Sequence, residues 1–307
     1  MMNRLWNFLK RIFGMDVAWE TMTLSRVGID PASARSLTRV LQPVHTVRLR
    51  PEPEERVDPE NARAAASLKL SWHGITDTGL VRDHNEDNFA FLDLGDMVLF
   101  VVADGMGGHD AGEIASDVAV RTVCSEVRKG DGWDLDPLAL VERAVQRANT
   151  EVRREASRKG SNMGTTLTVA LVEDDTAYIG SVGDSRVYCI ENGSIAQITE
   201  DHSVVAKLVA AGQLTKEEAR NHPRSNLLYR TIGNDETVKV NTYRKELTRG
   251  GTLLLCTDGL WGEVGDEEMR QICAGEEHTD LICARLVQKA DANGGKDNIT
   301  AIVAKVI

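Results

Sequence analysis

VLFVVADGMGG, residues 98–108, runs from a nearly continuous apolar segment into an aspartate and a cluster of glycines. The apolar segment predicts a buried strand that delivers Asp104 into a turn at the edge of the core. Gly105, Gly107 and Gly108 allow positive φ angles and a close approach of the backbone to a ligand. A main-chain carbonyl could then join the Asp104 carboxylate as an oxygen ligand, which is the chemistry that hard divalent cations prefer.

A second Asp-Gly pair repeats this arrangement. LLLCTDG, residues 253–259, again runs from an apolar strand into an aspartate, here Asp258. Asp297 follows a pair of glycines and opens the last strand candidate. Each motif alone could be an ordinary turn. Acids at several strand ends in one chain instead indicate a shared site for divalent cations.

An acidic pair also precedes an early strand candidate. Glu86 and Asp87 stand there, with Arg82 four residues before Glu86. An arginine beside acids is usually a solvated ion-pair partner. If cations neutralise these acids, the Arg82 guanidinium could instead bind a phosphoryl group through two hydrogen bonds.

The periodicity of the chain predicts an α+β fold. Runs rich in β-branched residues predict strands at 68–75, 88–94, 97–103, 165–173, 177–181, 186–191, 194–199, 252–256 and 299–307. Because many of these runs are close in sequence, we expect hairpins and antiparallel sheet. Helix signals occur at 113–128, 137–158, 204–211, 216–221, 266–274 and 279–290. The order predicts helices packed outside a sheet or a pair of sheets.

The first 67 residues differ in charge from the rest of the chain. They hold 10 basic and 8 acidic side chains, a net charge of +2, so residues 68–307 carry a net charge of −13 and the whole chain −11. Prolines and acids at 51–60 predict a linker. We therefore predict an N-terminal extension over 1–67 and one folded domain over 68–307. Within the extension, residues 4–13 predict a short amphipathic helix that either contacts a membrane surface or docks on protein.

Composition excludes several classes of function. The acidic balance argues against a nucleic-acid partner, which would require clustered lysines and arginines. No stretch is apolar over the ~18 residues that a membrane span requires. The five cysteines form no CxxC pair and most lie in apolar runs, which predicts buried, reduced thiols in a cytoplasmic protein.

Six motifs together resemble a known family. They are Arg82-x-x-Asn85-Glu86-Asp87, Ala103-Asp104-Gly105-Met106-Gly107-Gly108, Gly164-Thr165-Thr166, Gly183-Asp184-Ser185-Arg186, Thr257-Asp258-Gly259-Leu260 and Asp297-Asn298-Ile299-Thr300. In this order the chain resembles the metal-dependent protein phosphatases of the PPM (PP2C-like) family over about residues 70–307, and its Met-Gly-Gly form resembles the bacterial branch. The resemblance implies a four-layer αββα fold, in which a central antiparallel β-sandwich is flanked by pairs of helices.

The resemblance also implies a reaction and a set of metal ligands. Two Mn²⁺ or Mg²⁺ ions would support hydrolysis of phosphoserine and phosphothreonine by direct attack of a metal-bridging hydroxide. Asp104 would bridge both ions, and the further direct ligands would be the Gly105 carbonyl, Asp258 and Asp297.

Other residues receive roles around this metal core. Asp87 would be a ligand, directly or through water, and Glu86 would hold metal-bound waters. Arg82 would bind the phosphate. Asp184 would join Asp258 at a third, weaker metal site.

The chain departs from the family pattern at two positions. Met106 stands where some members carry a histidine proposed as the general acid, so that role is left to His84 or to a metal-bound water, and His109 does not inherit it. Gly262 stands where some members carry an acid at the third metal, with Glu263 one residue later, and this leaves the occupancy of that site open. We expect Arg186 to form a buried or semi-buried ion pair and Gly164-Thr165-Thr166 to pack beneath the site.

The resemblance leaves competing functions. The leading one is a Ser/Thr phosphatase whose substrates are proteins phosphorylated by a bacterial-type Ser/Thr kinase. An inert phosphoprotein-binding module on the same fold is the alternative, although such a module need not keep all the metal acids. A phosphatase acting on an anti-sigma-factor antagonist is a third hypothesis, for which the N-terminal extension is short. Residues 201–238 would form a flap beside the site, and a basic residue of this flap, Arg224 or Arg230, is either a contact for the phosphoprotein or part of a solvated loop.

Overall fold

The computed structural model describes residues 69–307 except 108–110, 131–135, 221 and 277. The amphipathic helix predicted at 4–13 and the linker at 51–60 lie outside the described residues, as does His109. None of the described helices is both long enough and apolar enough to cross a membrane.

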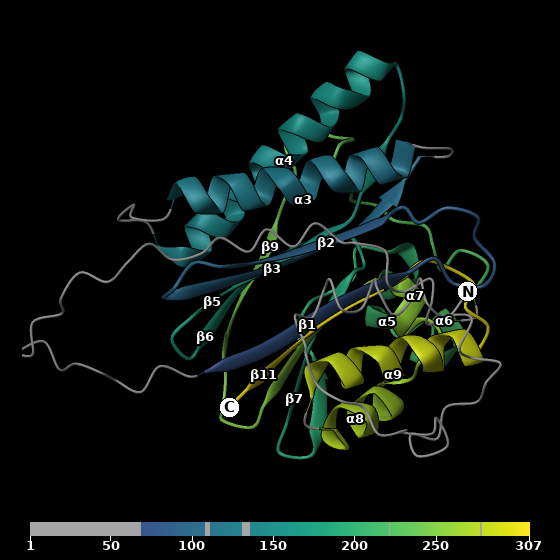
Figure 1. Cartoon of the computed structure of the whole chain (residues 1–307). Coiled ribbons are helices and arrows are strands. Elements are labelled where there is room, and N and C mark those ends of the chain that lie inside the picture. The colour runs from purple at the N-terminus through teal and green to yellow at the C-terminus, as the bar shows by residue number, and fades with distance from the viewer. Residues whose placement is uncertain (1–68, 108–110, 131–135, 221, 277) are drawn as a thin grey trace, which may run out of the picture. The chain divides into compact units, whose positions relative to one another are not determined.

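The described chain forms two antiparallel sheets that face each other (Figure 1). The first sheet has the order β1-β11-β10-β7-β8, with strands β1 (Leu70–Asp77), β11 (Ile299–Val306), β10 (Thr252–Cys256), β7 (Arg186–Glu191) and β8 (Ser194–Gln197). The second has the order β2-β3-β5-β6-β9, with β2 (Asp87–Asp93), β3 (Met97–Met106), β5 (Leu167–Glu173), β6 (Thr176–Val182) and β9 (Asn241–Glu246). The two-residue strand β4 (Gly164–Thr165) pairs with the end of β3.

A pair of helices covers the outer face of each sheet, which confirms the predicted four-layer αββα architecture (Figure 1). Helices α3 (Ala111–Gly130) and α4 (Pro137–Lys159) pack on the second sheet, and α8 (Asp266–Ala274) and α9 (Thr279–Ala292) pack on the first. The sequence sets both ends of α4. Asp136 accepts a hydrogen bond from the Ala139 amide as N-cap, and Gly160 ends the helix with φ +62°.

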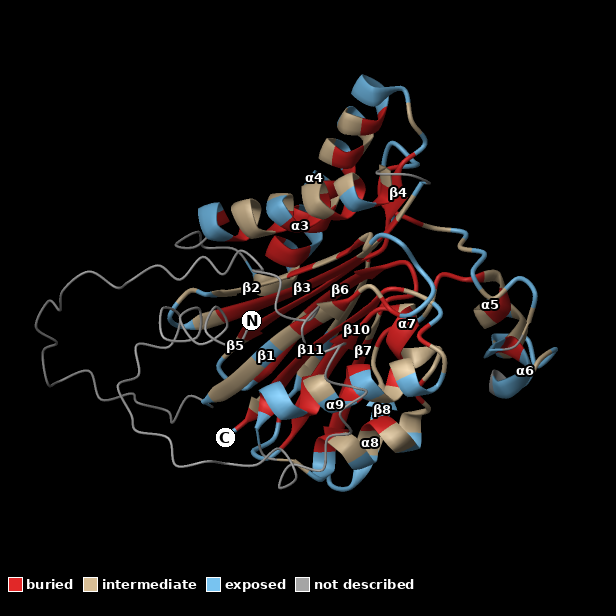
Figure 2. Ribbon diagram, turned by 45° about the vertical axis from the view of Figure 1, so that its right-hand side comes forward, coloured by how far each residue is buried: buried red, intermediate tan, exposed pale blue. Residues whose placement is uncertain are grey.

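Apolar side chains fill separate layers of this stack. Phe89, Phe100 and Ile302 belong to the cluster between the two sheets, and Leu99 and Val101 belong to the cluster under α3 and α4. Strand β3 supplies both clusters, since successive side chains of a strand point to opposite faces. This explains why residues 98–103 are apolar without interruption, because both faces of β3 are buried in the middle of the sandwich (Figure 2).

The flap predicted at 201–238 carries two short helices, α5 (Val204–Ala210) and α6 (Lys216–Arg220). Figure 2 shows these helices standing away from the sandwich. Two isolated bridges fix the base of the flap, one between Ser203 and Leu228 and one between Thr165 and Ile232.

Several details differ from the sequence predictions. Strand β3 continues to Met106, so Asp104 lies within the strand rather than in a turn after it. The predicted strand 165–173 is divided at Thr166 into β4 and β5. Asp258 begins a short helix, α7 (Asp258–Trp261), because the chain turns sharply once it leaves the sheet.

Candidate metal centre

Two acids from neighbouring strands lie directly opposite each other. Asp87 on β2 is the antiparallel partner of Asp104 on β3. Opposed residues of such a pair have Cβ atoms about 5 Å apart, and like charges there repel. The sheet register therefore imposes a concentration of negative charge at the end of the sandwich.

The backbone at Asp104 is fixed from both sides. Its amide donates to Thr166 Oγ1 at 2.9 Å, and its carbonyl accepts from Thr165 Oγ1 at 2.8 Å. The predicted packing of this threonine motif beneath the site is therefore present. Gly105 lies so close to α3 that a Cβ there would be 2.1 Å from the Gly112 carbonyl oxygen. Glycine is required at position 105 by this close approach, and not by a positive φ angle.

Asp258 and Asp297 come from adjacent chain segments at the same end. The Thr257 amide donates to the Thr300 carbonyl, which aligns the end of β10 with the start of β11. A Cβ on Gly259 would be 2.1 Å from the Asn298 carbonyl oxygen, so the two segments are in tight contact. The structure thereby brings these two acids into one neighbourhood, where burial, followed by the charge of Asp297, raises the pKa of Asp258.

Asn298 joins the loop that carries Arg82 to this segment. Its Oδ1 accepts from the Glu86 amide at 2.8 Å, and its Nδ2 donates to the carbonyls of Thr78 and His84 at 3.0 and 2.9 Å. Arg82 Nη2 donates to Asp297 Oδ2 at 2.7 Å. Sequence reasoning did not assign Asn298 a role, although its place directly after Asp297 in a motif was a signal for one.

Burial and mutual repulsion make these acids reluctant to ionise. Burial raises the pKa of Asp87 and of Asp104 well above the usual range, and in Asp104 the Asp87 and Asp258 carboxylates add to the rise. Burial followed by Asp297 raises the pKa of Asp258 to about 6. Burial likewise raises the pKa of Glu86. Buried acids with raised pKa values would ionise more readily if a positive charge were bound among them.

Three carboxylate oxygens of these acids are buried without any hydrogen-bond partner: Glu86 Oε1, Asp87 Oδ1 and Asp258 Oδ1; among the described residues, Asp291 Oδ1 on α9 is a fourth. Unpartnered buried polar atoms are rare, and a missing ion is one of their ordinary explanations. Carboxylate oxygens are also the donors that Mg²⁺ and Mn²⁺ prefer. The residues present therefore fit divalent cations.

The acids do not form a finished coordination shell. Among the described residues, no three Asp, Glu, His or Cys side chains are grouped as a metal site. Arg82, whose side chain is 45% exposed, pairs with Asp297 and supplies the positive charge there. The predicted assignment of Asp87, Asp104, Gly105, Asp258 and Asp297 as ligands therefore stays a prediction.

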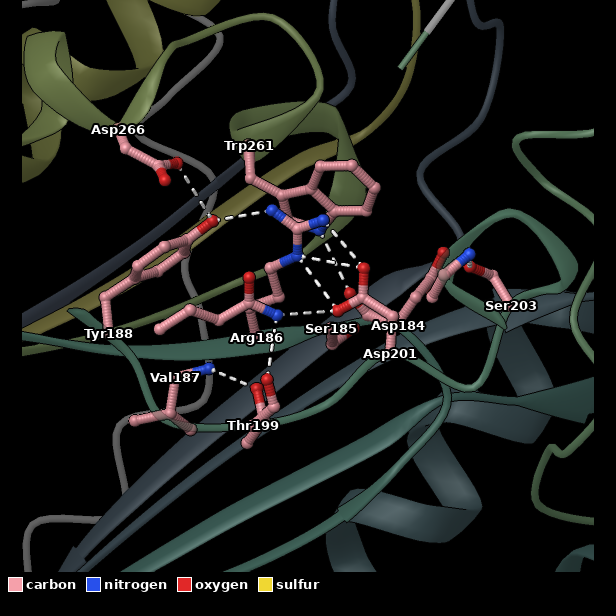
Figure 3. Close-up of polar contacts among 12 residues, drawn as sticks. Asp184, Ser185, Arg186, Val187, Tyr188, Thr199, Asp201, Ser203, Trp261 and Asp266 are labelled. Carbon is pink, nitrogen blue, oxygen red and sulfur yellow. Dashed lines mark hydrogen bonds and ion pairs between the residues drawn. The ribbon is translucent and has the colours of Figure 1, made fainter. Parts of the chain in front are cut away.

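Asp184 is buried beside a second network, which Figure 3 shows in close-up. Burial raises the pKa of Asp184 well above the usual range, with Asp258 the next cause. Its carbonyl accepts from Trp261 Nε1 at 3.0 Å. The Arg186 guanidinium lies 3.5 Å from the centre of the Trp261 ring and forms two-pronged hydrogen bonds with Asp201. This confirms the predicted ion pair of Arg186, which is semi-buried.

Two positions bear on the identity of the general acid: His84, and Met106 at the place where some family members carry a histidine. The His84 carbonyl accepts from Asn298 Nδ2, which fixes its backbone in the Arg82 loop. Met106 pairs with Gly164 at the end of β3. His84 as a proton donor stays a prediction.

Comparison with known proteins identifies relatives over most of the described chain. A family model described as Protein phosphatase 2C matches residues 81–303. The serine/threonine phosphatase stp of Listeria monocytogenes serotype 4b (strain F2365) is 37% identical over 241 residues, which cover 75% of this chain and 93% of that protein.

Solved structures agree with the sequence relatives. The S. agalactiae serine/threonine phosphatase superposes with a TM-score of 0.70 at 30% identity, over 78% of this chain and all of that one. The catalytic domain of the serine/threonine protein phosphatase PstP, solved in complex with two manganese ions, superposes with a TM-score of 0.69 at 34% identity, again over 78% of this chain and 100% of that one.

Proposed function

The chain belongs to the protein phosphatase 2C family, and from this membership we propose that its buried acids hold the divalent cations on which phosphate hydrolysis depends. It is a metal-dependent serine/threonine protein phosphatase. The observation that carries the ligand assignment is the set of three buried carboxylate oxygens without partners, on Glu86, Asp87 and Asp258.

The proposed ligands divide by position. Asp104, the Gly105 carbonyl, Asp258 and Asp297 would hold two cations, Mn²⁺ or Mg²⁺. Asp87 and Glu86 would complete the edge of the site, directly or through water. When bound, such cations lower the pKa of water and neutralise phosphoryl oxygens, which lets an acidic protein accept a phosphorylated substrate. Asp184 and Asp258 are the residues proposed for a third, weaker site.

Arg82 is the proposed phosphate ligand. It donates to Asp297 through one nitrogen, Nη2, and its side chain is 45% exposed. A guanidinium has five N–H groups in a fixed plane, so the others are available to a phosphoryl group arriving from solvent. The Asn298 side-chain amide donates to the carbonyls of Thr78 and His84, on either side of Arg82, and so holds the loop that carries this guanidinium.

The proposed substrates are proteins phosphorylated on serine or threonine by a bacterial-type kinase. The names of the relatives support this class, since stp is named a serine/threonine phosphatase and PstP and PhpP are named protein phosphatases. An inert phosphoprotein-binding module on the same fold is the alternative. The energetic strain among the buried acids favours the enzyme, because a scaffold would be more stable without them.

We further propose a cytoplasmic protein with peripheral membrane contact through residues 4–13. The support is the sequence pattern of apolar residues interleaved with Arg4, Lys10 and Arg11.

The test is hydrolysis of a phosphothreonine peptide by the whole chain with Mn²⁺, with EDTA, and after Asp104→Asn. We expect EDTA to abolish turnover and Asp104→Asn to lower it by at least about a hundredfold, because both remove charge stabilisation from the transition state. Asp136→Asn serves as the control, since asparagine preserves the N-cap of α4 far from these acids. Turnover that persists in the chelator would overturn the metal assignment, and an inactive wild type with Mn²⁺ would favour the scaffold.

A further inference from the structure

A closed ring of hydrogen bonds surrounds Asp87, and we propose that it makes this carboxylate present one oxygen, Oδ1, to the metal centre. Thr300, Thr76 and Asn85 are then positioning residues that act through Asp87. The inference rests on the proposed function, because it assumes a cation at this centre.

The two oxygens of Asp87 have different surroundings. Oδ2 accepts from Thr300 Oγ1 at 2.6 Å and from Thr257 Oγ1 at 2.8 Å. Oδ1 is buried with no partner. Thr257 and Thr300 are both fully buried, so water does not compete with their hydroxyl groups. Two short donors saturate Oδ2, and only Oδ1 is left for a further ligand.

Each hydroxyl has a single proton, which fixes the direction of the bonds. Thr300 gives its proton to Asp87, so Thr300 Oγ1 must accept from Thr76 Oγ1, 2.7 Å away. Thr76 Oγ1 in turn accepts from Asn85 Nδ2 at 2.9 Å. Asn85 Oδ1 accepts from the Asp87 amide at 3.1 Å, and this bond closes the ring.

The ring bridges the two layers of the sandwich. Thr76 on β1 and Thr300 on β11 are paired residues of one sheet, whereas Asp87 belongs to β2 of the other. Rotation of the Asp87 carboxylate would break the hydrogen bonds that it accepts from Thr300 and Thr257 at once. The ring therefore ties the orientation of Asp87 to the packing of the sheets and prevents Asp87 from binding a cation through both oxygens.

The ring also gives a role to motif residues that are not proposed metal ligands. Asn85 lies in the Arg82 motif, Thr257 directly precedes Asp258, and Thr300 ends the Asp297 motif. None of them is a proposed ligand. Their side chains meet at Asp87, which accounts for a polar residue at each position beneath an otherwise apolar sandwich.

The experiment measures Mn²⁺ binding by isothermal titration calorimetry on the whole chain and on three variants. Thr300→Val keeps the volume but removes the hydroxyl donor, and we expect Mn²⁺ affinity to fall at least about tenfold, as it does when a hydrogen-bond partner of a metal ligand is lost. Thr300→Ser restores the donor and should bind within about threefold of wild type. Thr122→Val is the control, because its hydroxyl bonds only to the Val118 carbonyl of α3 among the described contacts.

The outcomes separate the two proposals. Wild type that binds no Mn²⁺ contradicts the proposed function itself. Wild type and a folded Thr300→Val that bind Mn²⁺ equally well overturn the ring alone. Should Thr300→Val fail to fold, Thr76→Val decides, because it breaks the ring while the Thr300 bond to Asp87 remains. Affinity unchanged in Thr76→Val then counts against the ring, and an affinity loss of about threefold or more supports it.

Discussion

His202 lies buried at the base of the flap, and both of its ring nitrogens face hydrogen-bond donors. Nδ1 accepts from the Gly183 amide at 3.0 Å, and Nε2 is 2.8 Å from Arg230 Nη1. A second proton on the ring would break the bond from Gly183 and add positive charge beside the guanidinium. Burial, followed by Arg230, accordingly lowers the pKa of His202 to about 4.

This shift predicts an acid-sensitive contribution to stability. Because the folded pKa is about 4 and the ordinary value is 6.5, the contribution is complete above pH 6.5 and is lost as pH falls towards 4, where the unfolded chain takes up a proton that the folded chain refuses. We expect His202→Asn to reduce the loss of unfolding free energy between pH 7 and 4.5 by about 2 kcal/mol, after allowance for solvent screening. Urea unfolding at both pH values measures this. His222→Asn, in the same flap, is the control, and an equal effect there contradicts the assignment.

At the scale of secondary-structure elements, one guanidinium joins several segments (Figure 3). Arg186 on β7 binds Asp201 at the start of the flap, stacks on Trp261 of α7 and donates to Tyr188 at 2.7 Å. Tyr188 in turn lies 3.4 Å from Asp266 at the start of α8. The flap, α7 and α8 are therefore fastened to the same strand, next to Asp184.

We predict that Arg186→Lys destabilises the protein by about 2–4 kcal/mol, because lysine keeps the charge but loses the planar two-pronged contact and the ring stacking in a buried site. The matched control is Arg270→Lys, which alters a similar two-pronged pair with Glu267 at an exposed position. There the unfolding midpoint should stay near that of wild type. Urea unfolding in EDTA measures both variants. Equal shifts for the two arginines would show that burial of the Arg186 pair does not matter.

Most of the elements could be predicted from the sequence, and those that could not have identifiable reasons. Strands such as β10 are apolar and bounded by turn residues, so their limits were predictable. Strand β9 reads NTYRKE and was missed, because an edge strand with an exposed face carries little apolar signal. Helix α7 is four residues long and too short for any periodicity.

The acids of the candidate site could be predicted, but the contacts that orient them could not. Asp-Gly pairs at strand ends are visible in a sequence. The opposition of Asp87 and Asp104 depends on strand register, and the threonine ring around Asp87 depends on which strands of two different sheets lie together. Pairing between sheets leaves no periodic pattern in the chain.

At the scale of the whole molecule, this chain matches the full length of a solved relative but is longer than it. The superposition covers 100% of the S. agalactiae phosphatase and 78% of this chain. The family model begins at residue 81, well after the predicted boundary at 67. The phosphatase fold is therefore accounted for without the N-terminal extension.

We predict that residues 68–307 alone hydrolyse a phosphothreonine peptide within about threefold of the whole chain, because the proposed site draws on no residue before 76. Sedimentation with anionic vesicles should instead distinguish residues 68–307 from the whole chain. The whole chain should bind weakly, as expected for one amphipathic helix, and residues 68–307 should stay in the supernatant. Vesicle binding by residues 68–307, or none by the whole chain, contradicts membrane contact through 4–13.

The opposed carboxylates of Asp87 and Asp104 have a consequence for the life of the protein in the cell. Ligands that bind only the folded state raise its population by mass action. Cations that relieve the repulsion between these acids would therefore protect the chain from proteases as well as activate it. Metal starvation would then lower phosphatase abundance along with phosphatase turnover, and kinase signals would persist longer in manganese-poor cells.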